Sequence, residues 1–239
     1  MQKVEHPQKK NSADAINADQ AAPRLLRAYA TDSITVTLVF SEPMDSTKAS
    51  LVNGYSISDG IGAPAQVIPV APLFDRVTLK LTGANALARN KIYTVTVTAI
   101  ADCAGNAVGS SNMARVGLYE HIDSFNIVVN EILFNPKSNG VDYVEFYNRS
   151  NKILNLKNAY IANRATNGSI GSITQLSAED YLLFPQDFIV VTSDPSIVKR
   201  DYLAQNPDAF LTVSTPSFND DAGNVILLNE QGNIVDAVS

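Results

Sequence analysis

The sequence predicts an all-β protein that consists of two β-sandwich domains in tandem. Apolar and polar residues alternate along many short segments, as they do in strands with one buried face and one solvated face. Clusters of Asn, Asp, Gly and Pro separate these segments and favour tight turns. Hydrophobic residues make up 45% of the 239 residues and charged residues only 18%. This balance provides enough apolar material for two cores and suits sheets better than helices.

Residues 1–21 show no hydrophobic periodicity and are predicted to form a flexible leader. Pro23 marks the start of the first folded unit, which we place at residues 22–118. Three segments of this unit alternate strictly, so each is expected to bury one face. The expected buried positions are Ile34, Val36, Leu38, Phe40, Val77, Leu79, Leu81, Tyr93, Val95, Val97 and Ala99, and the expected solvated positions are Thr35, Thr37, Arg76, Thr78, Lys80, Thr94, Thr96 and Thr98.

Three motifs carry a family resemblance in the first unit. Residues 39–45 form a strand that ends in a Phe-Ser-Glu-Pro turn, residues 87–95 lead through a loop to a Tyr at the start of a later strand, and residues 102–106 form an Asp-x-x-Gly-Asn turn. Their order and spacing resemble the immunoglobulin-like (Ig-like) domains of bacterial S-layer and other cell-surface proteins. The second motif also resembles a tyrosine corner, in which the Tyr93 hydroxyl would bond to backbone near Leu87.

The second unit follows a short junction at residues 119–125 and extends over residues 126–239. Its opening, residues 128–150, contains two β-type segments, each with one acidic residue, Glu131 or Glu145, among apolar neighbours. This opening resembles that of a lamin tail domain, an Ig-like β-sandwich found in nuclear lamins and in many bacterial surface proteins. The short junction, without a long Gly/Ser linker, predicts limited freedom between the domains.

The rest of the second unit adds strands and one short helix. Asp194 is the predicted N-cap of the helix, Pro195 its first residue, and Asn206-Pro207 its expected end. Residues 221–238 fit the last hairpin of the lamin tail family, in which a further residue, commonly aromatic, ends the strand. Here the sequence stops at Ser239, so we expect an excerpt of a larger protein with a truncated last strand. The other expected strands cover residues 153–156, 160–162, 188–192, 225–228 and 234–238.

The charge of the chain argues against a nucleic-acid partner. The net charge is −6, whereas nucleic-acid binders need a basic field to displace counterions from phosphates. The basic clusters do not exceed the pairs Lys9-Lys10 and Lys199-Arg200. No segment approaches the ~18 consecutive apolar residues of a membrane span, and no signal peptide opens the chain. We therefore expect neither nucleic-acid binding nor membrane insertion.

The sequence offers no arrangement of residues typical of an enzyme. His6 in the leader and His121 in the junction stand in no metal-binding spacing and near no Gly-x-Ser-x-Gly motif. Cys103, the single cysteine, can form no intrachain disulfide and has no basic neighbour in the sequence to activate its thiol. Glu131 and Glu145 would approach one another if their strands pair, and close carboxylates serve glycosidases and metal sites. A structural role is the favoured alternative, so we predict no catalytic activity.

Calcium is the one cofactor hypothesis that the sequence raises. Ca²⁺ takes about six to eight oxygen ligands, and two loops are rich in Asp and Asn, although neither has the spacing of an EF-hand. Tight turns need the same residue types for positive φ and for side-chain capping, and this is the favoured alternative. The candidate ligands are Asp220, Asp221, Asn224 and Asp102, with Glu42 and Asp45 expected near Asp102.

The sequence supports two functional hypotheses. In the first, the chain is a non-catalytic structural or binding module of a large bacterial extracellular or cell-envelope protein, which spaces or attaches neighbouring domains or binds a protein or polysaccharide partner. In the second, it is the accessory (targeting or substrate-binding) region of a secreted hydrolase or nuclease, and sequencing the rest of the reading frame would reveal the catalytic domain. The candidates for stacking on a sugar are Tyr119, Tyr143, Tyr147 and Tyr160, each also explained by packing between strands.

Overall fold

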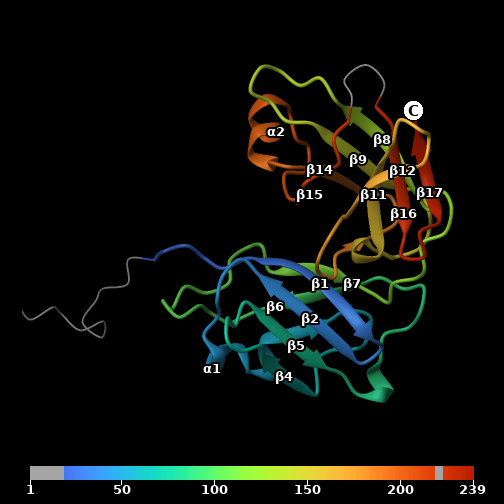
Figure 1. Cartoon of the computed structure of the whole chain (residues 1–239). Helices are drawn as coiled ribbons and strands as arrows, with labels where there is room; N and C mark the ends of the chain where they lie inside the picture. Colours follow the sequence, from blue (N-terminus) through green and yellow to red (C-terminus); the bar gives the residue numbers. More distant parts are fainter. Residues whose placement is uncertain (1–18, 219–222) are drawn as a thin grey trace, which may run out of the picture.

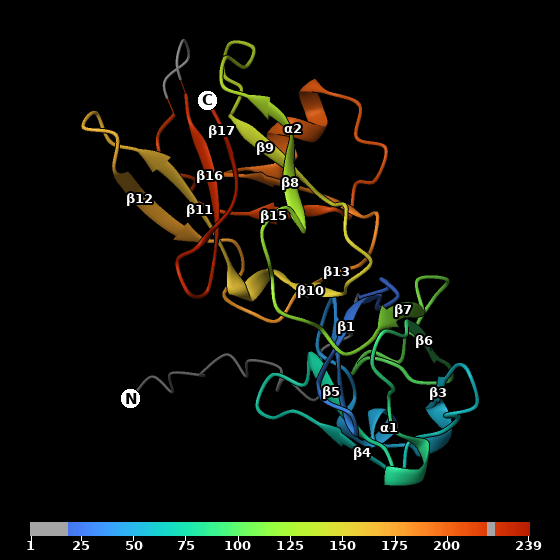
Figure 2. The ribbon, with the colours of Figure 1, turned by 90° about the vertical axis from the view of Figure 1, so that its right-hand side faces the viewer.

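The computed structural model describes residues 19–218 and 223–239, and these residues form two β domains. The first domain lies below the second in Figure 1. Figure 2 shows the same division after a quarter turn, with the strands of each domain gathered around their own centre. The predicted all-β class with two tandem sandwiches is confirmed. No helix within the described ranges is long and apolar enough to cross a membrane.

The first domain packs two antiparallel sheets against each other. The larger sheet has the strand order β1-β2-β5-β4, and the smaller sheet has the order β3-β6-β7. Leu38, Leu79 and Val95 belong to the core that both sheets share. The elements are β1 (Leu25–Asp32), β2 (Thr35–Phe40), α1 (Ser46–Ala49), β3 (Tyr55–Ile57), β4 (Gln66–Pro69), β5 (Arg76–Lys80), β6 (Tyr93–Val97) and β7 (Met113–Val116), with short 3-10 turns at Val52–Gly54 and Gly83–Asn85.

The alternation predicted for the later strands of this domain is confirmed. Val77 and Leu79 are fully buried in β5, whereas Arg76, Thr78 and Lys80 between and beside them are half-buried. Strand β6 repeats the pattern of alternately buried and half-buried residues. The inward residues of both strands therefore contribute to the core as the period of two requires.

The prediction that Thr35 and Thr37 face solvent is wrong, because all six residues of β2 are buried. Strand β2 is central in its sheet, and side chains of its neighbours cover the second face. Tyr29 of β1 lies opposite Thr37. Lys80 of β5 lies opposite Thr35, and its Nζ donates to Thr35 Oγ1 at 2.8 Å. Long neighbouring side chains thus bury a face that alternation alone assigns to water.

Two residues at the ends of predicted buried faces are exposed. Ile34 lies in the turn before β2, and its side chain is 39% exposed. Ala99 lies beyond the end of β6 and has a φ of 57°, which takes it out of the extended conformation. Both predictions fail because the strands are shorter than the apolar alternation suggests.

The tyrosine corner predicted at Tyr93 is present. Its side chain is 4% exposed, and its hydroxyl accepts a hydrogen bond from the Ala88 backbone N–H at 3.0 Å. This contact lies one residue after Leu87, which is itself buried in the core. The bond spans the loop before β6 and fixes the start of that strand.

Replacing Tyr93 by Phe should lower the free energy of unfolding of the first domain by about 1 kcal/mol, because Ala88 N–H loses its acceptor. Urea denaturation followed by circular dichroism measures this change. Tyr160→Phe is a matched control, since that side chain packs on an apolar cluster and its hydroxyl forms no hydrogen bond within the described ranges. An unchanged midpoint for Tyr93→Phe would contradict a stabilising tyrosine corner.

The second domain packs two four-stranded sheets, β12-β11-β16-β17 and β15-β14-β9-β8, with a small β10-β13 pair beside them. Neighbouring strands run antiparallel apart from the parallel pair β14 and β15. The predicted last hairpin is confirmed as β16 and β17. The strands are β8 (Ile127–Leu133), β9 (Tyr143–Asn148), β10 (Leu154–Asn155), β11 (Ala159–Arg164), β12 (Ile170–Gln175), β13 (Leu182–Leu183), β14 (Phe188–Thr192), β15 (Phe210–Thr212), β16 (Val225–Asn229) and β17 (Ile234–Val238), with a 3-10 turn at Leu156–Asn158.

The predicted helix is α2 (Pro195–Asp201), and it begins as expected. Asp194 is the N-cap, and its carboxylate accepts a hydrogen bond from the Ser196 N–H. The helix ends at Asp201, earlier than the expected end at Asn206-Pro207. Tyr202 leaves the helical conformation with a φ of −133°, and its ring packs edge-on against Tyr143 of β9. A tertiary contact therefore ends the helix before the proline does.

Each domain has its own hydrophobic core. The core of the first domain extends to Val116, and the core of the second domain begins at Ile122. No residue belongs to both clusters within the described part of the chain. Separate cores are what independently folding domains require.

A fragment of residues 22–120 should therefore fold alone, with a β-type circular dichroism spectrum and cooperative thermal unfolding. Calorimetry on the fragment and on the full chain measures both transitions. If the fragment is unfolded while the full chain melts in a single transition, the two domains share one cooperative unit and the expectation fails.

Candidate functional site

The two domains meet in a packed joint. Ile153, Leu182 and Phe184 of the second domain form a buried cluster against Tyr29 of β1. Gly117 lies at the same joint, and a Cβ at this position would collide with Ile153 Cδ1. Glycine thus allows the chain to pass close to the second domain as it leaves the first.

A single carboxylate links the second domain to two strands of the first. The Glu179 carboxylate accepts hydrogen bonds from Arg27 Nη2 of β1, at 2.6 Å, and from Arg76 Nη2 of β5. The Arg27 guanidinium also lies over the Tyr181 ring, 5.6 Å from its centroid. Charge-assisted hydrogen bonds of this kind are stronger than neutral ones and fix direction as well as distance.

A second ion pair fixes the joint at another strand. Arg115 Nη2 of β7 donates to Asp187 Oδ2 at 2.6 Å. The same guanidinium lies 4.3 Å from the centroid of the Phe184 ring, where a cation–π contact is favourable. Phe184 therefore joins the apolar cluster and this ion pair into one contact area.

The segment predicted as a junction, residues 119–125, is bound to the second domain. The Glu120 N–H donates to a backbone carbonyl of that domain at 2.8 Å. Ile122 is only 1% exposed and belongs to the second core. His121 Nδ1 lies 2.8 Å from Glu230 Oε1. This contact gives His121 a structural partner within the second domain.

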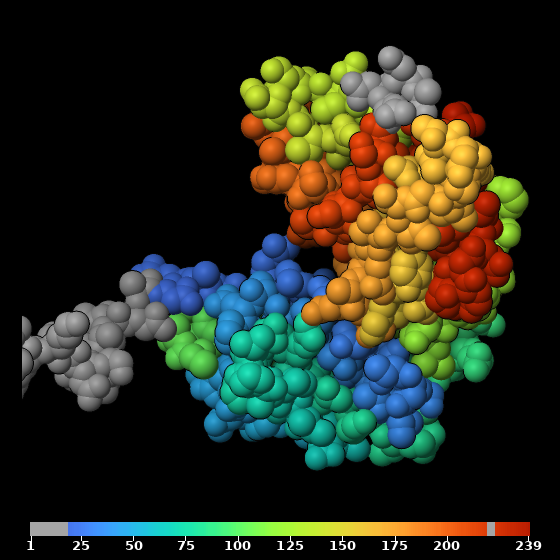
Figure 3. Space-filling model, in the orientation of Figure 1, coloured from blue at the N-terminus to red at the C-terminus, as the bar shows by residue number. Residues whose placement is uncertain are grey.

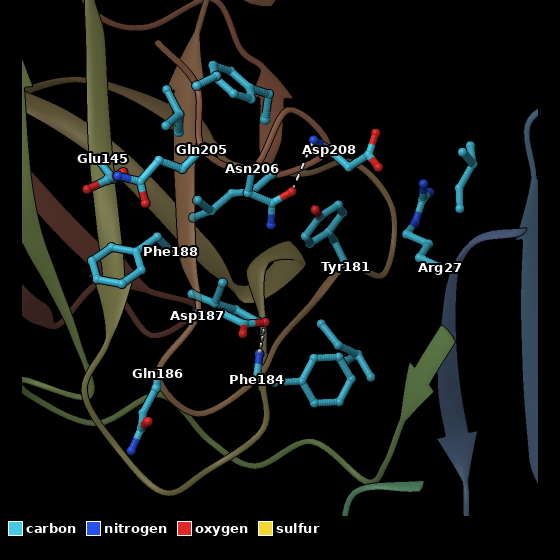
Figure 4. Close-up of a pocket in the computed structure, with 18 of the residues that line it drawn as sticks. Arg27, Glu145, Tyr181, Phe184, Gln186, Asp187, Phe188, Gln205, Asn206 and Asp208 are labelled. Atoms are coloured by element: carbon cyan, nitrogen blue, oxygen red, sulfur yellow. Dashed lines mark hydrogen bonds between the residues drawn. The ribbon is translucent and has the colours of Figure 1, made fainter. Parts of the chain in front are cut away.

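A groove of about 730 Å³ opens between the domains. Figure 3 shows it as a hollow between the blue segment around β1 and the orange segment around α2. Its floor is the outer face of the sheet β15-β14-β9-β8. Strand register places Phe210, Val190, Glu145 and Glu131 in one row across the four strands. In Figure 4, Glu145 and Phe188 lie on one side of the groove and Arg27 on the other.

Glu131 and Glu145, expected to approach one another if their strands pair, are register partners on β8 and β9. The Tyr143 hydroxyl donates to Glu131 Oε1, and Asn130 Nδ2 donates to Glu145 Oε1 at 2.6 Å. Burial and the Glu131 carboxylate raise the pKa of Tyr143, so this phenol remains a donor at neutral pH. Neither glutamate forms an ion pair within the described ranges. The arrangement is a pair of hydrogen-bonded carboxylates at the floor of a groove.

Among the calcium candidates, Asp102 belongs to an acidic cluster. Carboxylate oxygens of Asp19, Glu42 and Asp102 all lie within 4.8 Å of one another. Asp102 is 2% exposed, and its Oδ1 accepts hydrogen bonds from Gly105 N at 2.7 Å and Asn106 N at 2.8 Å. These bonds form the Asp-x-x-Gly-Asn turn, so Asp102 has a structural role there.

Asp102 and Glu42 of this cluster have opposite pKa shifts. Burial raises the pKa of Asp102, but hydrogen bonds from Asn106 and Gly105 outweigh burial and hold the pKa below its usual range. The stability that this charge contributes is therefore lost as pH falls through the lowered pKa. Burial, together with the Asp19 and Asp102 carboxylates, raises the pKa of Glu42. The stability that protonated Glu42 contributes to the folded domain is fully present below its usual pKa. It is lost as pH rises through the raised pKa.

The other calcium candidates lie elsewhere or have another use. Asp45 is close to the turn through its N–H bond to a carbonyl at 3.0 Å, but its Oδ1 caps α1 by accepting from Thr47 N and Lys48 N. Asp220 and Asp221 lie outside the described residues. Asn224 directly precedes β16 in the second domain, remote in the chain from the Asp102 turn.

Two family models together match nearly the whole chain. The model described as Bacterial Ig-like domain matches residues 13–117, and the model described as Lamin Tail Domain matches residues 123–239. The chain joins a bacterial Ig-like domain to a lamin tail domain. Both resemblances inferred from the sequence motifs are confirmed. No curated protein matches this sequence.

Solved structures of S-layer proteins show distant similarity. The N-terminal part of the bacterial S-layer protein SbsC is 15% identical, covering 70% of this chain and 45% of that chain, with a TM-score of 0.37. A structure of surface layer protein SbsC, domains 1–6, is 13% identical, covering 87% of this chain and 39% of that chain, with a TM-score of 0.36. The chain thus spans less than half the length of these structures. TM-scores this low do not establish a shared overall fold.

The tyrosines of the lamin tail domain mostly pack against other residues. Tyr147 stacks on Phe188 with ring centroids 4.6 Å apart, and Tyr143 meets another ring edge-on. Tyr160 packs against the small apolar cluster of β11 and β16. The predicted packing role is confirmed for these three, whereas Tyr119 at the junction is 39% exposed.

The residues that join the bacterial Ig-like domain to the lamin tail domain have no distinguishing pattern in the sequence. Glu179 is separated from Arg27 by 152 positions and from Arg76 by 103 positions. Each looks like an ordinary solvated charge in its own segment. Pairing over such separations leaves no local signal in one sequence.

Replacing Asp102 by Ala should destabilise the bacterial Ig-like domain by about 2 kcal/mol, because a charged acceptor of the turn is lost. The loss should be equal in EDTA and in added calcium, since hydrogen bonds within the turn account for this residue. Thermal unfolding in both solutions measures it, with Glu42→Gln as the control from the same cluster. A calcium-dependent rise in the melting temperature of the wild type, absent from Asp102→Ala, would instead indicate a calcium site.

Proposed function

We propose that the chain is a non-catalytic structural module of a larger bacterial extracellular or cell-envelope protein. In this role the bacterial Ig-like domain and the lamin tail domain hold neighbouring parts of that protein at a fixed distance and angle. The observation that carries the proposal is the Glu179 carboxylate, which binds Arg27 and Arg76 from different strands of the other domain. A spacer needs such an orientation-specific joint, whereas a flexible tether does not.

Contacts at separated points support a fixed angle. Glu179 binds at β1 and β5, whereas Asp187 binds Arg115 of β7 in the other sheet. Exposed ion pairs each contribute only about 0–1 kcal/mol. Here they surround the buried cluster of Phe184 and Ile153, which contributes by removing apolar surface from water. A rotation between the domains would break contacts on both sides at once.

The surroundings of the titratable residues support a non-catalytic role. His121 contacts Glu230 of the same domain, and Glu131 and Glu145 each accept a hydrogen bond from a side chain of the opposite strand. General acid–base catalysis needs a proton-transfer group within reach of a substrate together with a second group of suited pKa. The described residues provide the carboxylate pair without a histidine beside it.

Nuclear magnetic resonance relaxation tests the spacer role. The two domains of the wild type should tumble as one body of 25.7 kDa and share one alignment tensor in residual dipolar couplings. Glu179→Ala combined with Phe184→Ala should uncouple them and shorten the correlation time of each domain by about a factor of two, because tumbling scales with size.

A matched control removes the same residue types away from the joint. Glu131→Ala combined with Phe188→Ala changes only the groove floor of the lamin tail domain, so the common alignment tensor should persist. Independent tumbling of the wild-type domains would refute the spacer role. So would a common tensor in the Glu179→Ala and Phe184→Ala double variant.

A further inference from the structure

The groove between the domains exposes large apolar side chains on both of its walls. Phe188 on the lamin tail domain is 45% exposed, and Leu203 beside α2 is 93% exposed. Leu26 on the first domain is 47% exposed across the groove. Exposed apolar residues gathered around one concavity mark a binding surface more often than scattered ones do.

The charges that line the groove are unevenly neutralised. Its cations are paired: Arg27 with Glu179, and Arg115 with Asp187. Its two remaining acids on the floor, Glu131 and Glu145, have hydrogen bonds but no ion pair within the described ranges. Lys199 beside the groove has its Nζ over the Phe210 ring, 4.5 Å from the centroid. The two glutamates of the floor therefore lack an ion-pair partner within the described ranges.

The positions of these glutamates add a specific electrostatic constraint. They lie directly opposite one another on adjacent antiparallel strands, where like charges are destabilising. The same cross-strand row continues through Val190 to Phe210, so apolar surface borders the carboxylates. A cation between the glutamates would relieve their repulsion, and apolar groups attached to it would cover the rest of the row.

We propose that this groove binds a short segment of a partner protein that carries a Lys or Arg between apolar side chains. The cationic group bonds to Glu131 and Glu145, and the flanking apolar side chains cover Phe188 and Val190. Charge complementarity selects this occupant over a neutral glycan, which would leave the repulsion of the carboxylates in place. The volume of about 730 Å³ suits a few side chains. This partner site adds to the spacer role, and it rests on the same relative position of the two domains, which forms the groove.

Isothermal titration with the acetylated peptide Leu-Lys-Leu-Lys-Leu tests the site on the full chain. We expect saturable binding that weakens with rising salt, because the contacts are partly exposed ion pairs. Glu131→Gln combined with Glu145→Gln should weaken binding about tenfold. The double variant Glu42→Gln and Glu120→Gln removes the same charge outside the groove and should bind like the wild type. Equal melting temperatures of the variants exclude a folding defect.

Several outcomes of these titrations would overturn the proposal. The peptide Leu-Glu-Leu-Glu-Leu should not bind, and equal affinity for it would leave only unspecific apolar adsorption. Saturable binding of maltohexaose without binding of the lysine peptide would assign the groove to polysaccharide. Absence of peptide binding up to about 1 mM, or unchanged affinity in the Glu131→Gln and Glu145→Gln variant, would also refute it. The relaxation test changes residues of the joint, whereas the titration changes residues of the groove floor, so failure of one proposal can be told apart from failure of the other.

Discussion

The placement of the two domains depends on one carboxylate that two arginines share. Glu179 lies between Arg27 and Arg76, which come from strands of the first domain that are not adjacent in its sheet. Because each arginine approaches from its own strand, the carboxylate constrains rotation as well as separation. Arg76 Nε is buried without a hydrogen-bond partner in the described part of the chain, and such a group costs about 1–3 kcal/mol. The apolar cluster at the same joint offsets this cost.

The groove is a consequence of the same joint. Its floor belongs wholly to the lamin tail domain, but Leu26 and Arg115 of the first domain close its other wall. Without the joint the floor would be an open sheet face with two exposed carboxylates. The relative position of the domains therefore creates a concave surface that neither domain has alone.

Local patterns in the sequence predict much of the fold. The tyrosine corner at Tyr93, the N-cap at Asp194 and the last hairpin each depend on residues a few positions apart, and each is present. The burial of Thr35 and the early end of α2 depend on side chains from other strands, which local patterns do not contain. The acidic pair of the groove was predicted only on condition that β8 and β9 pair, and its surroundings come from both domains.

Gly117 makes the joint between the domains sensitive to a single substitution. A Cβ at this position would collide with Ile153 Cδ1 of the second domain and with the Lys91 backbone carbonyl of the first domain, so any larger residue would press on both domains. In a row of linked domains, a tilt at one joint is multiplied along everything that follows it. A single codon at this position therefore bears both on the backbone of the first domain and on the angle at which the second domain leaves it.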